Sequence, residues 1–226
     1  MGRKKEAVQT AAPLIPPNAT WAELRDRAAR CQACNLWKRG TQTVFGEGGE
    51  RSRVLFAGEQ PGNDEDLQGR PFVGPAGRVL DRALEEVGID RSLVYVTNVV
   101  KHFKWEPRGK RRIHTKPNMQ EIAACMPWLN AEIVLVRPLV IVCLGATAAQ
   151  ALLGRQFRVT KERGQPLTSS PLAPYIVATV HPSSILRAPD DETRRAGREQ
   201  FTEDLRTVAR LLSITSRYQG PAGSAA

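Results

Sequence analysis

The sequence predicts an α/β protein, a three-layer α/β/α sandwich around a central, mostly parallel four-stranded sheet. Two observations predict this fold class. Four short apolar runs have the length and composition of strands buried on both faces, namely residues 54–57, 93–96, 139–144 and 175–180. Helical patterns separate these runs, and strands that alternate with helices form parallel sheets with helices on both faces.

The helices are predicted from the residues that start and stop them. Thr20 and Glu23 have the spacing of a capping box, which opens the first helix. Gly88 is suited to end one helix in the left-handed conformation, while Pro117 and Pro138 bound another. The expected helices cover residues 20–31, 77–87, 118–136, 147–153 and 192–213.

Length and composition indicate one soluble domain. The 226 residues suffice for a single well-buried core, which we place at 19–215, between a flexible lead-in (1–18) and a disordered tail (216–226). No apolar stretch is long enough to cross a bilayer, and the N-terminus lacks the apolar region of a secretory signal. We therefore expect a cytoplasmic protein without a membrane partner, acting as a monomer.

The charge balance favours a polyanionic partner. Lys and Arg number 33 against 23 Asp and Glu, a formal charge of +10, although an arginine-rich proteome would also explain this excess. Residues 101–116 contain seven Lys or Arg and one acid, together with His102, Trp105 and His114. Such a run is either a solvated loop or a surface that binds phosphates, and we expect His102 to line its base.

Polar residues follow each predicted strand where it ends. These are Gly58-Glu59-Gln60-Pro61-Gly62, Thr97-Asn98, Gly145-Ala146-Thr147 and His181-Pro182-Ser183-Ser184. In an open parallel sheet, ligands bind beyond the carboxyl ends of the strands. The sequence therefore predicts a site at this edge that contains a carboxylate, an amide and an imidazole.

These side chains suit the excision of a base from DNA. The base must leave the stack, be held by its polar edge and an aromatic face, and depart with its charge stabilised. His181 suits a donor to the departing O2 of uracil, Asn98 matches the donor and acceptor of its O4/N3 edge, and Phe72 suits a stacking platform. Glu59 suits a carboxylate that stabilises the oxocarbenium ion of the sugar.

Each of these residues also has a purely structural explanation. His181 and Phe72 could be core residues, Asn98 an ordinary end of a strand, and Glu59 a helix cap. The sequence His-Pro-Ser-Ser at 181–184 favours the functional interpretation, because a rigid turn followed by two serines at a helix start is suited to binding phosphates.

Four segments together resemble the iron–sulfur uracil-DNA glycosylases. They are GEQPGNDEDLQGRPFVGPAG (58–77), TNVVKHFKW (97–105), the cysteine pattern and HPSSILR (181–187), and the resemblance extends from Cys31 to the last helix. Within that superfamily, Gln60 and the basic segment Gly109-Lys110-Arg111-Arg112-Ile113-His114 are similar to the UdgX type. This resemblance implies a DNA repair enzyme that excises uracil and then traps the sugar on a loop histidine, here His114.

The resemblance extends to the substrate contacts. We expect Gln60, Phe72, Asn98 and His181 to hold uracil, in single-stranded and also double-stranded DNA. DNA contacts are expected from Lys110, Arg111, Arg112, Ser183, Ser184 and Arg187. Glu59, His114 and His181 form the expected catalytic set. Two alternatives stay open: an ordinary turnover glycosylase whose His114 only assists DNA binding, and a non-catalytic DNA-binding iron–sulfur protein.

The four cysteines fit a metal site better than a disulfide framework. Cys31-x-x-Cys34 follows a helix, while Cys125 and Cys143 fall on a helix and a strand with seventeen residues between them, which fits a zinc knuckle poorly. A [4Fe–4S] cluster with four cysteine ligands suits this spread better, and the resemblance implies it. Scattered core thiols are the alternative.

Overall fold

Five strands form the central sheet, in the order β2-β1-β5-β7-β6. The computed structural model describes residues 9–49 and 51–218. The four parallel strands are β1 (Val54–Gly58), β2 (Val94–Asn98), β5 (Val140–Leu144) and β7 (Tyr175–Thr179). The predicted α/β class is confirmed, but the number of strands was wrong. The fifth, β6 (Pro166–Leu167), is an antiparallel edge strand of two residues, too short to give an apolar run.

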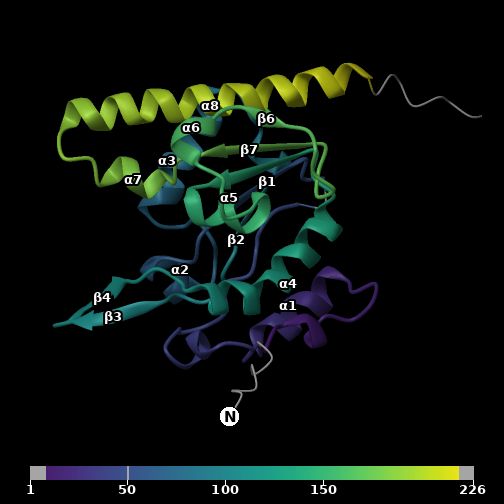
Figure 1. The fold of residues 1–226 in the computed structure, drawn as a ribbon, viewed down its shortest axis with the longest axis vertical. Coiled ribbons are helices and arrows are strands. Elements are labelled where there is room, and N and C mark those ends of the chain that lie inside the picture. Colours follow the sequence, from purple (N-terminus) through teal and green to yellow (C-terminus); the bar gives the residue numbers. More distant parts are fainter. Residues whose placement is uncertain (1–8, 50, 219–226) are drawn as a thin grey trace, which may run out of the picture.

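Helices cover both faces of this sheet (Figure 1). They are α1 (Trp21–Ala29), α2 (Asn63–Gln68), α3 (Pro75–Glu86), α4 (Met119–Val136), α5 (Ala146–Leu153), α6 (Val159–Glu162), α7 (Pro182–Leu186) and α8 (Asp191–Tyr218), with short 3-10 turns at Ala12–Leu14, Asn35–Lys38 and Arg91–Leu93. The helices expected from capping and stop signals are present. The short helices α2 and α6 were not predicted, because six and four residues are too few to show a helical period.

Alternate strand residues point into two separate cores. Val54 and Phe56 of β1 pack with α3 and α8, whereas Leu55 and Ala57 pack with α1, α4 and α5. Strands β1, β2 and β5 have five residues each, and every one of these residues is buried. This explains why the sequences of these strands are largely apolar instead of alternating between apolar and polar residues. The sheet is therefore rigid on both faces, and its strand ends are held in fixed positions.

The basic segment forms a second, separate sheet. β3 (Trp105–Arg108) and β4 (Arg111–His114) pair as an antiparallel hairpin, with Trp105 opposite His114. Gly109 turns the chain at a φ of 60°. Figure 1 shows this hairpin projecting beyond the carboxyl ends of the main strands. What the sequence suggested as a loop is thus an ordered arm.

The ends of the described chain add to the domain. Ala11 is fully buried and its N–H donates to the carbonyl of Ala124 in α4, so part of the expected lead-in packs against the domain. Helix α8 runs to Tyr218 and so includes the first residues of the expected tail. Residues 1–8 and 219–226 lie outside the described residues. No helix in the described ranges is long and apolar enough to cross a membrane.

Candidate active site

A cavity of about 850 Å³ lies at the carboxyl ends of the parallel strands. This volume is in the range of ligand pockets. The cavity brings together the predicted catalytic and uracil-binding residues, which come from five separate parts of the chain. Its lining includes Glu59, Gln60, Phe72, Asn98, His114 and His181, and also Thr147, Ser183 and Arg187.

His181 is held as a neutral donor. It is the N-cap of α7, and its Nδ1 accepts a hydrogen bond from the backbone N–H of Ser183 at 3.2 Å. Burial lowers the pKa of His181 to about 4, so the ring is neutral at physiological pH. A neutral imidazole whose Nδ1 accepts must bear its proton on Nε2. That Nε2–H is the group available to a ligand in the cavity.

Two glycines make room around this imidazole. A Cβ on Gly58, at the end of β1, would lie 3.4 Å from His181 Nε2 and would overlap Asn98 Oδ1. A Cβ on Gly145 would lie 3.1 Å from His181 Cβ, and Gly145 also has a φ of 88°. Glycine at the ends of β1 and β5 therefore leaves the space that the imidazole of His181 and the amide of Asn98 occupy.

Phe72 forms one wall of the cavity in a strained conformation. Its φ of 57° is unusual for a residue with a side chain, and its ring is nearly parallel to that of His181, with centroids 6.2 Å apart. Gly77 accommodates the turn, because a Cβ there would overlap the carbonyl of Phe72. Strain of this kind persists where surrounding structure enforces it, and it often marks functional sites.

The carboxylate of Glu59 contacts two side chains of the cavity, His114 and Thr147. Its Oε1 lies 3.3 Å from His114 Nε2, and its Oε2 accepts a hydrogen bond from the Thr147 hydroxyl. Burial raises the pKa of Glu59, but the contacts with His114 and Thr147 outweigh it, so the pKa lies below its ordinary value. Glu59 is therefore ionised at neutral pH, and Thr147 orients it. Thr147 was predicted at a strand end like the other site residues, but no role was predicted for it.

Gln60 holds the hairpin. The side chain is 7% exposed, and its Nε2 donates to the carbonyls of Lys104 and Thr115 at 3.1 and 3.2 Å. Its Oε1 accepts from the backbone N–H of Lys104 at 3.2 Å. The amide thus ties together the two ends of the hairpin at its base, and Gln60 also lines the cavity where the contact with uracil is predicted.

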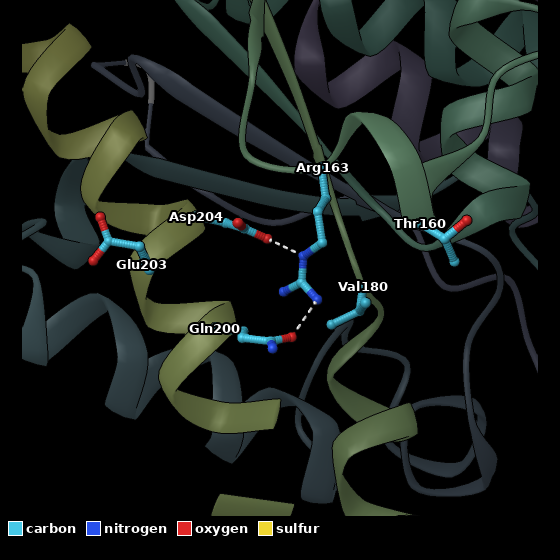
Figure 2. Close-up of a pocket in the computed structure, with 6 residues that line it drawn as sticks. All are labelled: Thr160, Arg163, Val180, Gln200, Glu203 and Asp204. Carbon is cyan, nitrogen blue, oxygen red and sulfur yellow. Dashed lines mark hydrogen bonds and ion pairs between the residues drawn. The ribbon is translucent and has the colours of Figure 1, made fainter. Parts of the chain in front are cut away.

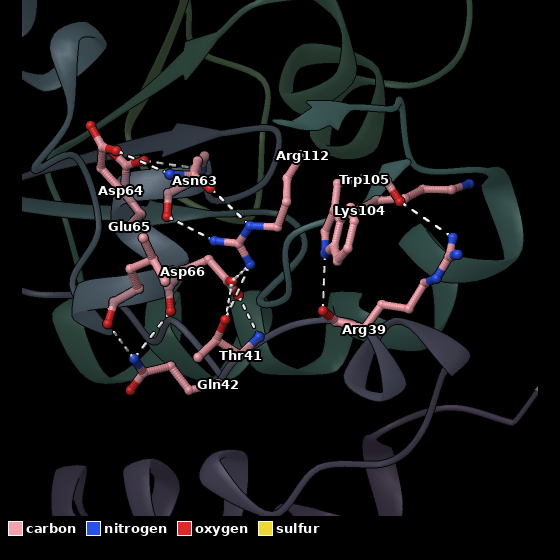
Figure 3. Close-up of polar contacts among 12 residues, drawn as sticks. Arg39, Thr41, Gln42, Asn63, Asp64, Glu65, Asp66, Lys104, Trp105 and Arg112 are labelled. Atoms are coloured by element: carbon pink, nitrogen blue, oxygen red, sulfur yellow. Dashed lines mark hydrogen bonds and ion pairs between the residues drawn. The ribbon is translucent and has the colours of Figure 1, made fainter. Parts of the chain in front are cut away.

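Arg112 holds the same hairpin from its other face (Figure 3). Its Nη1 lies 2.6 Å from Oδ2 of Asp66, which is fully buried in α2, and its Nε donates to Asn63 Oδ1 at 2.8 Å. The guanidinium also lies over the rings of Phe103 and Trp105, 5.4 and 5.5 Å from their centroids. The guanidinium therefore bonds mainly within the protein, and its predicted contact with phosphate stays a prediction.

The remaining predicted DNA-binding residues are more accessible. Lys110 and Arg111 are exposed near the tip of the hairpin, and Ser184 and Arg187 are exposed on and just after α7. Ser183 is half-buried beside His181, with its hydroxyl 2.8 Å from Nδ1. Of these residues, Ser183 and Arg187 line the cavity, whereas Lys110, Arg111 and Ser184 lie outside its lining.

Three of the four cysteines share one region. Burial raises the pKa of Cys125 to about 12, with smaller effects in the same direction from Cys34 and Cys31. Cys143 lies in the middle of the sheet on β5, fully buried, and burial alone raises its pKa. The thiols form no disulfide. In the described residues, no three His, Cys, Asp or Glu side chains are arranged to hold one metal ion.

His102 lies outside the lining of the main cavity. It is 5% exposed, its Nε2 lies 3.0 Å from the Thr43 hydroxyl, and burial lowers its pKa to about 4. Its ring lies against Gly40, in the turn that follows Cys34. This agrees with the expected place at the base of the basic segment.

A second cavity of about 470 Å³ lies apart from the predicted site residues (Figure 2). Arg163 projects into it and pairs with Asp204 of α8, from Nε to Oδ2 at 2.8 Å. Asp204 also accepts a hydrogen bond from the Thr179 hydroxyl at the end of β7. These contacts attach α8 to the sheet, which is a structural role.

The fold and the main cavity define an α/β enzyme with a carboxylate, an amide and a neutral imidazole at the carboxyl edge of a parallel sheet. Residues 45–206 match the model of the Uracil DNA glycosylase superfamily. The chain is 42% identical over 171 residues to the type-4 uracil-DNA glycosylase of Thermotoga maritima, covering 75% of this chain and 85% of that protein. It is 33% identical over 203 residues to the type-4 enzyme of Sulfurisphaera tokodaii, covering 87% and 86%. The type-5 uracil-DNA glycosylase of Thermus thermophilus is 31% identical over 228 residues, with 91% and 95% covered.

The chain therefore belongs to the uracil-DNA glycosylase superfamily. The residues 45–206 that match the family model include every residue named above as lining the main cavity. The cysteine pair at 31 and 34 lies before the matched segment.

Proposed function

We propose that this protein excises uracil from DNA and then remains covalently bonded to the abasic sugar through His114, as the UdgX type does. One observation carries the proposal: His114 lies inside the same cavity as His181 and Asn98, against the ionised carboxylate of Glu59. The substrate is uracil-containing DNA, and the role is DNA repair.

Excision breaks the bond between C1′ of the sugar and N1 of uracil. Both electrons leave with the base, so uracil departs as an anion and the sugar becomes an oxocarbenium ion. The Nε2–H of His181 donates to O2 of the departing base, and the carboxylate of Glu59 stabilises the cation. Asn98 holds the polar edge of the base, and Phe72 provides an aromatic face. Because His181 is neutral, it acts as a hydrogen-bond donor rather than a cation.

Trapping forms a bond between C1′ and one nitrogen of His114. The lone pair of that nitrogen attacks the oxocarbenium ion, and the proton on the other nitrogen then passes to Glu59 or to water. The product is a neutral alkylated imidazole, which is a poor leaving group. A side chain that is already in place outcompetes water because positioning is worth very large effective molarities. The contacts of Gln60 and Arg112 with the hairpin provide this positioning.

The cysteines support a bound [4Fe–4S] cluster with a structural role. Cys31, Cys34 and Cys125 would supply thiolate ligands that tie the N-terminal segment to α4. Two N–H groups point at these thiols: the backbone N–H of Lys101 lies 3.2 Å from Cys125 Sγ, and Trp128 Nε1 lies 3.3 Å from Cys31 Sγ. Hydrogen bonds to sulfur are typical around such ligands.

Two residues are candidates for the fourth ligand. Cys143 is the predicted ligand, but it does not share the electrostatic environment of the other three thiols. His102 is a second candidate, because its ring lies against Gly40 in the segment after Cys34 and burial lowers its pKa to about 4, which leaves the imidazole neutral. Iron content of the Cys143→Ser and His102→Ala variants distinguishes the two.

A denaturing gel tests the proposal. Mixing the protein with a uracil-containing oligonucleotide should give a band of protein plus DNA that survives denaturation. His114→Ser should instead release the abasic product, while Lys110→Ser, an exposed change on the same hairpin, should still cross-link. Abasic product in multiple-turnover amounts from the unmodified protein would support an ordinary glycosylase. Uracil left intact would support a non-catalytic DNA-binding protein.

A further inference from the structure

Lys101 is buried beneath the uracil-binding end of β2. The sequence places it in the basic run, yet its side chain is 1% exposed. Its Nζ has three hydrogen-bond acceptors, each at 2.6 Å: the Thr97 hydroxyl, the backbone carbonyl of Asn98 and Oε2 of Glu132. An ammonium group has three protons, so every donor is used.

Glu132 completes this buried network from helix α4. It is 0% exposed and accepts hydrogen bonds from the backbone N–H of Gly46, the hydroxyls of Tyr95 and Thr97, and Lys101. The network therefore joins β2, α4 and the segment before β1, and Lys101 is its only member that bonds to the backbone of Asn98 among the described residues.

Stability alone does not account for a buried ion pair. Removing two charges from water costs several kcal/mol, and apolar residues of similar volume often replace such a pair without loss. Leucine or methionine would fill the space of Lys101 but would leave the carbonyl of Asn98 without its donor. Of the three hydrogen bonds of Lys101, the one to Asn98 is the bond that reaches a residue of the cavity.

The position of Asn98 requires this restraint. It is the last residue of β2, pairs with Gly58, and places its amide in the cavity beside His181. After it the chain turns, with Val99 and Val100 donating to Gly58 and Glu59. A shift of the Asn98 carbonyl would move its side chain relative to the base, because both depend on the same backbone dihedrals.

We propose that Lys101 is a positioning residue that fixes Asn98 for recognition of the base edge. This inference rests on the proposed excision of uracil. Lys101 does not touch the substrate; it acts through the backbone of Asn98, and Glu132 keeps its ammonium in place.

The test is a double-mutant cycle read by single-turnover uracil excision at saturating protein. Lys101→Met should lower the rate by about 10- to 100-fold, as expected for a small misplacement of a binding group. In an Asn98→Ala background the same change should lower it by less than about twofold, because the effects of coupled residues do not add. Affinity for an undamaged oligonucleotide should not change, since the phosphate contacts lie elsewhere.

Two further variants separate positioning from folding. Lys101→Met/Glu132→Gln avoids an unpaired buried carboxylate and should show the same loss of rate, even if Lys101→Met alone folds poorly. Tyr95→Phe removes a hydrogen bond from the same network without touching Asn98, so its rate should stay within about twofold of the unmodified protein, as expected for an indirect contact.

The outcomes are distinct. If Lys101→Met/Glu132→Gln excises uracil at the normal rate, or if the loss is equally large in the Asn98→Ala background, Lys101 does not act through Asn98 and the inference fails. If the unmodified protein leaves uracil in place, the proposed function itself fails.

Discussion

Replacing Arg112 with alanine should separate uracil excision from covalent capture. Arg112 attaches the β3–β4 hairpin to α2 through the buried carboxylate of Asp66, with a distance of 2.6 Å between Nη1 and Oδ2. Its side chain is 19% exposed. Removing one partner of a buried pair costs about 3–5 kcal/mol, and because Arg112 is partly exposed we take the lower value. Asp66 keeps its two hydrogen bonds from Thr41.

If the free energy that holds the hairpin against α2 falls by about 3 kcal/mol, the ratio of docked to undocked hairpin falls by about 100-fold. His114 lies on this hairpin, whereas His181, Asn98 and Glu59 lie at the ends of the main strands. The yield of cross-linked DNA should therefore fall sharply while free abasic product increases. The assay is a time course on a denaturing gel, with the two products measured in the same lane.

Arg111→Ala is the matched control. Arg111 is exposed on the same strand and is expected to contact phosphate, so its loss should weaken DNA binding but leave the ratio of the two products unchanged. Cross-linking by Arg112→Ala at the rate of the unmodified protein would refute the idea that this ion pair positions His114.

Three further outcomes follow from the site and the cysteines. The ring of His181 should stay neutral from pH 8 to pH 5 in ¹⁵N NMR of labelled histidine, and titration of this ring near pH 6.5 would contradict the assignment. Because the pKa of His181 falls from 6.5 to about 4 on folding, the free energy of unfolding should decrease by about 3 kcal/mol as the pH drops from 6.5 to about 4. Thr147→Val should raise the pKa of Glu59 and slow excision more at pH 5 than at pH 8, and equal slowing at both would argue against this role of Thr147. Cys125→Ala should lose iron and visible absorbance, whereas full iron in Cys143→Ser would exclude Cys143 as a ligand.

The strand ends could be predicted because they follow a local rule. Each parallel strand is a short apolar run, and each polar group directly follows its run, as Glu59, Asn98 and His181 do. Parallel pairing then brings these residues to one edge whatever the details of the helices. Strand β6 was not predicted because two residues, one of them proline, are too few to form an apolar run.

The hairpin and the buried network could not be predicted in this way. β3 and β4 contain charged residues and Pro107 in place of alternating apolar residues, so no strand pattern is present. Their position depends on contacts between residues far apart in sequence, such as Arg112 with Asp66 and Lys101 with Glu132. A lysine in a basic run gives no local sign that it will be buried against a glutamate of a distant helix.

Within residues 9–49 and 51–218, the β3–β4 hairpin forms a two-stranded sheet of its own and shares no backbone hydrogen bonds with the central sheet. A change in its length or sequence would therefore reach the central sheet only through side-chain contacts such as those of Gln60 and Arg112, and not through the strand register. If His114 captures the sugar as proposed, exchanging this one arm would change the fate of the sugar and leave Glu59, Asn98 and His181 in place at the strand ends.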